Sequence, residues 1–261
     1  MDESTIVALG DELYGALRRC EPVAPLTDRY PELALEDAYR ISKSFLTRRL
    51  ADGEKLVGKK IGVTSVAVQQ MLGVHQPDFG FLTDAMCFPN GGEVPLSGHS
   101  ILPRAEGEIA FKLKSELRGP GITNADVLAA TEAVIPCFEI VDSRVKDWKI
   151  KIQDTVADNA SCHSFVLGEQ GVSPHDVDLS TCGMVIEKNG ELLSTGAGAA
   201  ALGSPVNCVT WLANTMGSLG ISLEAGDIIL SGSLVPLEGV HPGDTMSLRI
   251  GGIGSASVRF I

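Results

Sequence analysis

Arg104-Ala-Glu-Gly-Glu-Ile-Ala-Phe111 and Val134-Ile-Pro-Cys-Phe-Glu-Ile-Val141 are the two stretches that indicate most about this chain. Both have the composition of buried strands, and both carry carboxylates. In a strand, side chains two positions apart share a face, so Glu106 and Glu108 are expected to project together while Phe111 faces the core. Glu139 lies inside an apolar run, where burying an unpaired carboxylate is costly. Something positive is therefore expected to meet these acids.

A hard divalent cation is the simplest such partner. Three carboxylates with no histidine close in sequence favour Mg²⁺ or Mn²⁺, which accept oxygen ligands, over Zn²⁺. The alternative is a network of ion pairs in which Arg104 and Arg144 neutralise the three glutamates. The spacing favours a metal site formed by Glu106, Glu108 and Glu139 and leaves the ion pairs open.

The composition excludes several classes of function. With 261 residues, 44% of them hydrophobic and 21% charged, the chain resembles an ordinary globular protein with a sizeable core. A formal net charge of −12 argues against nucleic acid, which needs a basic surface. The start of the chain does not resemble a signal peptide, and no apolar run has the length of a membrane span. We therefore expect a cytoplasmic protein.

The six cysteines form no C-x-x-C pair, so neither a zinc knuckle nor a redox motif is indicated. Cys162 lies in a polar segment beside His163. Because neighbouring side chains diverge, His163 is poorly placed to act as its base, and a structural role is favoured.

The periodicity predicts an α+β protein. Apolar faces predict helices around residues 6–17 and 35–50, and the alternation over 56–63 predicts a strand with Lys60 on a face cleared by glycines. His75 to Gly80 reads as a loop. After residue 90 strands dominate, with a hairpin at Asn189-Gly190 and two inserted helices. We divide the chain into a helix-rich region 1–90, which contributes Lys60 and Asp78, and a catalytic region 91–261.

Other segments have two interpretations. The run 195–201 formally fits a dinucleotide-binding pattern, but it follows a hairpin strand, and small residues for close packing explain it better. The polar segment Val156 to Ser161 either orients a water or a carboxylate, or forms an ordinary turn. Lys60 is either solvated or binds a substrate anion, and its position favours the second. Asp78 either has a role in the site or only shapes a turn.

Five segments together carry a resemblance to a known family. They are Gly58-Lys-Lys-Ile-Gly-Val-Thr-Ser65, Arg104-Ala-Glu-Gly-Glu-Ile-Ala-Phe111, Phe138-Glu-Ile-Val-Asp-Ser-Arg144, Val156-Ala-Asp-Asn-Ala-Ser161 and Gly226-Asp-Ile-Ile-Leu-Ser-Gly232. The chain resembles the fumarylacetoacetate hydrolase superfamily over essentially its whole length, and more closely its branch of 2-hydroxypenta-2,4-dienoate hydratases. The resemblance implies a mixed β-roll core with a small helix-rich N-terminal region.

The resemblance also implies an activity. It implies metal-dependent hydration of 2-hydroxypenta-2,4-dienoate to 4-hydroxy-2-oxopentanoate, in the meta-cleavage degradation of aromatic compounds, with Glu106, Glu108 and Glu139 holding Mg²⁺ or Mn²⁺. Lys60 and Ser161 would bind or position the substrate, and Asp78 would transfer a proton or activate water. Two alternatives stay open: a 4-oxalocrotonate decarboxylase, which shares most of these motifs, and a weakly catalytic structural partner of that decarboxylase. A homo-oligomer and a complex with the decarboxylase are expected by resemblance alone.

Overall fold

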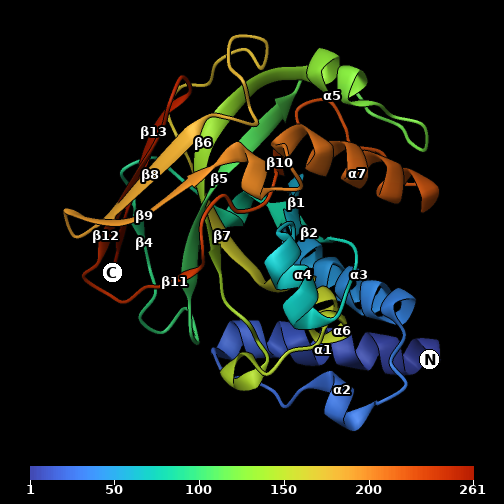
Figure 1. Cartoon of the computed structure of the whole chain (residues 1–261). Coiled ribbons are helices and arrows are strands. Elements are labelled where there is room, and N and C mark those ends of the chain that lie inside the picture. The colour runs from blue at the N-terminus through green and yellow to red at the C-terminus, as the bar shows by residue number, and fades with distance from the viewer.

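The computed structural model describes residues 1–261, apart from the side chains of residues 71 and 72 (Figure 1). The helices are α1 (Glu3–Arg19), α2 (Leu26–Arg29), α3 (Leu35–Ala51), α4 (Val66–Leu72), α5 (Asn124–Ala130), α6 (Ile152–Ala157) and α7 (Pro205–Ser218). The strands are β1 (Leu56–Gly62), β2 (Asp78–Thr83), β3 (Cys87–Phe88), β4 (Glu93–Val94), β5 (Arg104–Leu113), β6 (Thr131–Val141), β7 (Cys162–Leu167), β8 (Gly183–Lys188), β9 (Glu191–Ala197), β10 (Ile228–Leu230), β11 (Glu238–Gly239), β12 (Thr245–Ile250) and β13 (Gly254–Phe260).

Two helices form most of the N-terminal layer, at the bottom of Figure 1. The apolar faces of α1 and α3 pack together around Leu13, Ile41 and Phe45, as the periodicity predicts. The layer is completed by α6, which brings Val156 and Ala157 into the same cluster. This layer therefore draws on two distant parts of the sequence.

The large sheet carries the candidate site residues. Its strand order is β2-β1-β10-β5-β6-β7-β3, with β11 also paired to β5. One face contributes Ile109, Phe111 and Phe138 to the main hydrophobic cluster. Glu106, Glu108 and Glu139 belong to the opposite face, because they alternate with these residues along β5 and β6.

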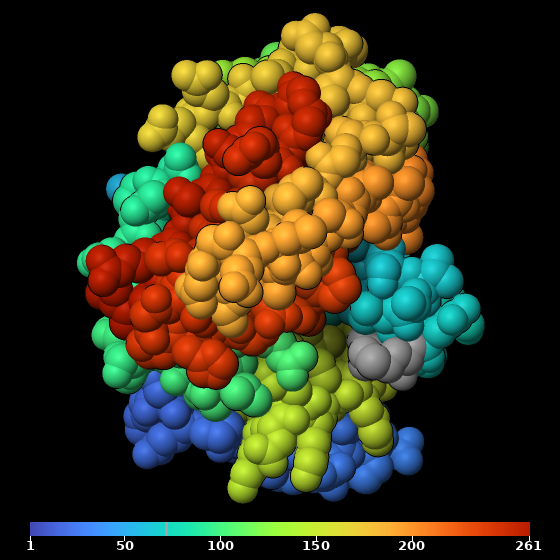
Figure 2. All heavy atoms as spheres, turned by 60° about the vertical axis from the view of Figure 1, so that its left-hand side comes forward, coloured from blue at the N-terminus to red at the C-terminus, as the bar shows by residue number. Residues whose placement is uncertain are grey.

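A second sheet covers the apolar face of the first. Its order is β4-β13-β12-β8-β9, and Leu248 and Val258 join Phe138 in one core. Figure 2 shows β8, β9, β12 and β13 as one continuous orange-to-red surface over this part of the molecule. The α+β class and the β-roll core are therefore as predicted. The three glutamates predicted to bind a metal lie on the face of the large sheet that is turned away from the second sheet.

Most predicted local features are present. Asn189 and Gly190 both have positive φ and join β8 to β9. The predicted loop from His75 to Gly80 is wrong in its second half, because Asp78 to Gly80 pair with β1 as the start of β2. The division at residue 90 stays a prediction, although β1 and β2 join the large sheet. Among the described residues, no helix is long and apolar enough to cross a membrane.

Candidate metal centre and active site

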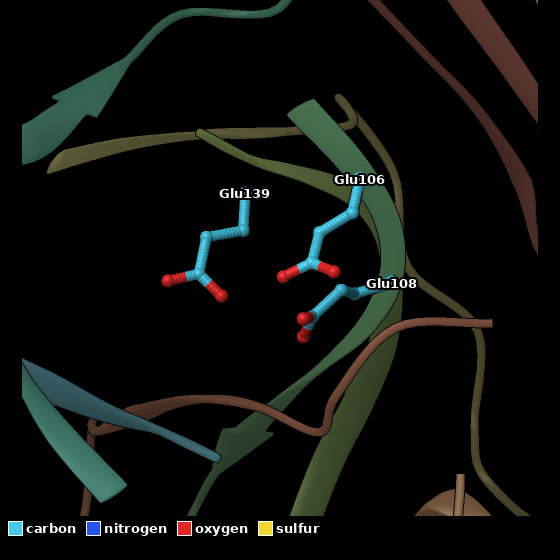
Figure 3. Close-up of side chains that lie close together, drawn as sticks. All are labelled: Glu106, Glu108 and Glu139. Carbon is cyan, nitrogen blue, oxygen red and sulfur yellow. The ribbon is translucent and has the colours of Figure 1, made fainter. Parts of the chain in front are cut away.

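Three carboxylates converge on the face of β5 and β6 that is turned away from the second sheet (Figure 3). Glu106 and Glu108 project from β5, and the antiparallel register places Glu139 of β6 directly opposite Glu106. One oxygen from each of the three lies within 4.8 Å of the others. Glu108 and Glu139 are fully buried, whereas Glu106 is partly exposed. The strand spacing thus brings the predicted ligands together.

The two fully buried acids, Glu108 and Glu139, lack enough partners among the described residues. Glu108 Oε2 accepts a hydrogen bond of 2.8 Å from the Gly232 amide, but Glu108 Oε1 and both Glu139 oxygens accept no hydrogen bond, and Glu139 Oε1 has only an ion-pair contact with Lys60. Burial, followed by the charge of Glu139, raises the pKa of Glu106 to about 7 and that of Glu108 well above its usual range. A hard divalent cation would satisfy buried carboxylate oxygens that accept no hydrogen bond, because it takes such oxygens as ligands.

Lys60 supplies the positive charge nearest to this cluster. Its Nζ lies 3.1 Å from Glu139 Oε1, and both side chains are almost fully buried. Burial opposes the ammonium charge, but the neighbouring carboxylates, led by Glu139, outweigh burial and raise the pKa of Lys60. The prediction that Lys60 stands on the glycine-flanked face of β1 beside the acidic site agrees with this geometry.

Arg104 and Arg144 take no part in this cluster. Among the described residues, the alternative in which these two arginines neutralise the glutamates is therefore not formed. The Arg104 guanidinium lies 5.1 Å from the ring centre of Trp148. Arg144 pairs with Asp158, and both side chains are fully buried. Its backbone N–H also donates to Asp158 Oδ2 over 2.9 Å. One lysine therefore faces three glutamates, too few positive charges to neutralise them when all three are ionised.

Asp78 lies at the start of β2, on the same sheet face as Lys60. It is 2% exposed, and its Oδ1 has no hydrogen-bond partner. Burial raises the pKa of Asp78 to about 6, although Lys60 acts in the opposite direction. A Cβ placed on Gly62 would collide with Asp78 Oδ1 and lie 3.4 Å from Lys60 Nζ, so both side chains border the same space. Such a carboxyl group can hold or release a proton near neutral pH.

Ser161 ends a strained turn before β7. Asn159, Ala160 and Ser161 all have positive φ, a conformation that costs non-glycine residues energy and is often found at functional sites. The Ser161 hydroxyl lies 3.2 Å from Thr155 Oγ1 and is buried. The Asn159 carboxamide binds both backbone groups of Phe81 in β2. The polar segment therefore joins two strands of the site.

Gly232 and Cys162 also lie at this site, although no motif in the sequence indicates that either approaches the glutamates. Gly232 has φ of +99°, and a Cβ at this position would collide with the Thr64 side chain. The absence of a Cβ therefore permits the backbone conformation in which the Gly232 amide donates to Glu108. Cys162 is buried where the charge of Glu139 adds to burial in raising the pKa of its thiol. The run Gly226 to Gly232 was recognised as a family motif, but nothing in its composition indicates that one amide binds a glutamate.

Comparison with known proteins places this geometry in a family. The model of the fumarylacetoacetate (FAA) hydrolase C-terminal domain matches residues 59–261. A 2-hydroxypent-2,4-dienoate hydratase of Pseudomonas putida is 70% identical over 222 residues, which are 85% of this chain and 100% of that protein. A 2-hydroxyhexa-2,4-dienoate hydratase of Comamonas testosteroni is 55% identical over 260 residues, 99% of this chain and 98% of that one.

A solved structure gives a similar result. The 4-oxalocrotonate decarboxylase of Pseudomonas putida G7, complexed with magnesium and adipate, superposes with a TM-score of 0.97 at 39% identity and covers 100% of this chain and 99% of its own. The same decarboxylase has also been solved with calcium and acetate. Divalent cations are thus found in a protein of the same fold and of moderate sequence identity.

Proposed function

The chain belongs to the fumarylacetoacetate hydrolase family and is a hydro-lyase of the 2-oxopent-4-enoate hydratase type, and from this premise we propose that it hydrates 2-hydroxypenta-2,4-dienoate to 4-hydroxy-2-oxopentanoate with the help of a divalent metal ion. The observation that carries the proposal is the convergence of three buried or partly buried carboxylates beside Lys60, in a chain 70% identical to a hydratase. By the same resemblance we assign the reaction to the meta-cleavage degradation of aromatic compounds.

Glu106, Glu108 and Glu139 would hold the cation. Their oxygens suit Mg²⁺, and Mn²⁺ accepts the same ligands. When bound, the ion supplies positive charge that stabilises negative charge developing on the substrate's oxygens. The Gly232 amide keeps one Glu108 oxygen fixed, which leaves the other free for the cation.

Lys60 would bind the charged end of the substrate. Its buried ammonium remains protonated and contacts Glu139, so it can donate hydrogen bonds to a carboxylate or an enolate oxygen at the same place. Ser161, held by its strained turn, would help to position that end. Both groups act on the oxygens of the substrate and not on its hydrocarbon part.

Asp78 would move the protons. In the first step the enol O–H of the substrate loses its proton and C5 gains one, which gives an α,β-unsaturated 2-oxo acid. In the second step the oxygen of water forms a bond with C4 and loses one proton, the π bond between C3 and C4 breaks, and C3 receives a proton. One water is consumed, and the proton count balances. A carboxyl group with a pKa of about 6 can both accept and donate in these steps.

The test is the ultraviolet decay of freshly generated 2-hydroxypenta-2,4-dienoate with the chelated protein, and again after Mg²⁺ or Mn²⁺ is returned, with the product identified. Conversion to 4-hydroxy-2-oxopentanoate that depends on the metal is expected. Lys60→Met should abolish conversion. Lys59→Met is its matched control, because Lys59 is equally buried but lies on the opposite face of β1, paired with Asp227. Folded protein that takes up metal but converts none of this substrate would refute the proposal.

A decarboxylase is the second candidate, because the solved 4-oxalocrotonate decarboxylase superposes so closely. The higher identity to two hydratases favours hydration. Release of CO₂ from 4-oxalocrotonate, at a rate exceeding hydration, would reverse this order. We also propose a homo-oligomer and an association with such a decarboxylase. Sedimentation of the chain alone, and of the two proteins together, tests these two proposals.

A further inference from the structure

A cavity of about 290 Å³ lies beside Asp78, at the edge of the large sheet. Its wall is mainly apolar and is formed by Leu35, Val74, Pro77 and Ile152, from α3, the segment before β2, and α6. Its volume is several times the ~30 Å³ that one water molecule occupies in the liquid. The cavity can therefore hold a short hydrocarbon chain.

The cavity wall also carries polar side chains. His75 and Gln76 are exposed, Tyr39 is partly buried, and Asp78 is buried. Tyr39 stacks on Phe79 with ring centres 4.3 Å apart, which fixes the aromatic part of the wall next to Asp78. A mainly apolar wall that carries a few polar groups, among them a buried carboxyl group, is typical of a binding pocket.

The cavity continues the candidate site at the end away from the carboxylate cluster. Glu139 contacts Lys60, Lys60 and Asp78 border the same space above Gly62, and Asp78 lines the cavity. The charged end of the proposed substrate is held at the first of these positions. Its C4 and C5 atoms must then point toward Asp78, and any group attached beyond C5 points toward the apolar wall.

We propose that this cavity receives the hydrocarbon end of the substrate, and that Leu35, Val74 and Ile152 set how long an alkyl extension beyond C5 the enzyme accepts. The ligand class is 2-oxo and 2-hydroxydienoic acids with an apolar tail. The inference rests on the proposed function, since that function fixes which end of the substrate is charged. Each methylene that enters an apolar pocket is worth about tenfold or more in discrimination.

The first experiment measures binding without turnover. Calorimetry with the Mg²⁺-loaded protein compares 2-oxobutanoate, 2-oxopentanoate, 2-oxohexanoate and 2-oxoheptanoate. We expect the affinity to rise about tenfold per added methylene until the cavity is filled. Val74→Phe, which occupies the cavity, should remove most of this rise, and Val74→Ala, which adds space and cannot clash, should extend the rise to a longer acid.

Val66→Phe is the matched control. It makes the same substitution on the neighbouring helix α4, at a side chain that is 64% exposed and does not line the cavity. It should keep the wild-type dependence on length. The second experiment compares kcat/KM for 2-hydroxyhexa-2,4-dienoate and 2-hydroxypenta-2,4-dienoate, and Val74→Phe should lower this ratio by about tenfold.

The outcomes separate the two proposals. Affinities that do not depend on length, absence of binding for all four acids, or a length dependence that neither Val74 variant changes would overturn the assignment of the cavity. Length-dependent binding that the Val74 variants alter, together with no conversion of either dienoate, would support the cavity assignment and refute the proposed hydration.

Discussion

Replacement of Asn159 by alanine is expected to destabilise the protein strongly, because this side chain bonds the turn before β7 to the backbone of Phe81 in β2. We call this pair of hydrogen bonds the Asn159 seam. β2 is the last strand at one end of the strand order, yet it contacts the turn before β7. Asn159 Oδ1 accepts from the Phe81 N–H over 2.8 Å, and its Nδ2 donates to the Phe81 carbonyl over 2.9 Å. The carboxamide thus does for the edge of β2 what a neighbouring strand would do.

The magnitude follows from burial. Asn159 and Phe81 are 1% and 7% exposed, so the alanine variant leaves a buried N–H and a buried carbonyl without partners. Each such group costs about 1–3 kcal/mol, and we expect a total loss of about 3–4 kcal/mol in the free energy of unfolding. Gly80→Ala should also destabilise, since its new Cβ would lie 2.6 Å from the Asn159 carbonyl oxygen.

Asn214 provides the matched control for the alanine variant. Its Oδ1 accepts from the amides of Gly121 and Ile122 over 2.6 and 2.8 Å, and its Nδ2 donates to the Ile122 carbonyl over 2.8 Å. It is only partly buried, so water can replace these bonds, and Asn214→Ala should cost about 1 kcal/mol. Urea unfolding at one fixed protein concentration measures both variants. Equal losses, or a loss below about 1 kcal/mol for Asn159→Ala, would contradict the stability assigned to the Asn159 seam.

Three further predictions concern buried charge. Asp158→Ala should lower the free energy of unfolding by about 3–5 kcal/mol, because Arg144 is left buried without its ion-pair partner. Asp11→Ala, which breaks an exposed pair with Arg48, should lower it by less than about 1 kcal/mol. Similar losses in the two variants would contradict this reasoning. Mg²⁺ at about 100 times its Kd should stabilise the wild-type protein by about 2.7 kcal/mol, measured by thermal or urea unfolding. It should stabilise the Glu139→Gln variant much less. An equal gain in both proteins would exclude Glu139 as a ligand. In the metal-free protein, burial raises the pKa of Asp78 from 3.8 to about 6, against Lys60 and with a contribution from Glu139, so the folded state holds the proton more tightly. This contribution to stability is complete below pH ~4 and is lost as the pH rises through about 6, by up to about 3 kcal/mol, and Asp78→Asn should gain stability over the wild type across that window.

The sequence by itself determined the local structure and the identity of the candidate ligands. Alternation in Arg104 to Phe111 places two glutamates on one face of a strand, whatever the rest of the fold does. The hairpin at Asn189-Gly190 follows from short-range backbone chemistry in the same way. The motifs also indicate the family, since they combine chemical groups at fixed spacings along most of the chain.

Only the tertiary structure decided which distant residues meet. The register of β5 and β6 sets Glu139 opposite Glu106, and the parallel pairing of β1 with β10 brings Lys60 to the same face. Periodicity fixes the face of each strand but not its neighbour, because strand order depends on the packing of the whole core. The contact of Asn159 with Phe81 depends on how the sheet curls. The cavity beside Asp78 depends on where three separate segments pack. Neither feature therefore leaves a local signal in the sequence.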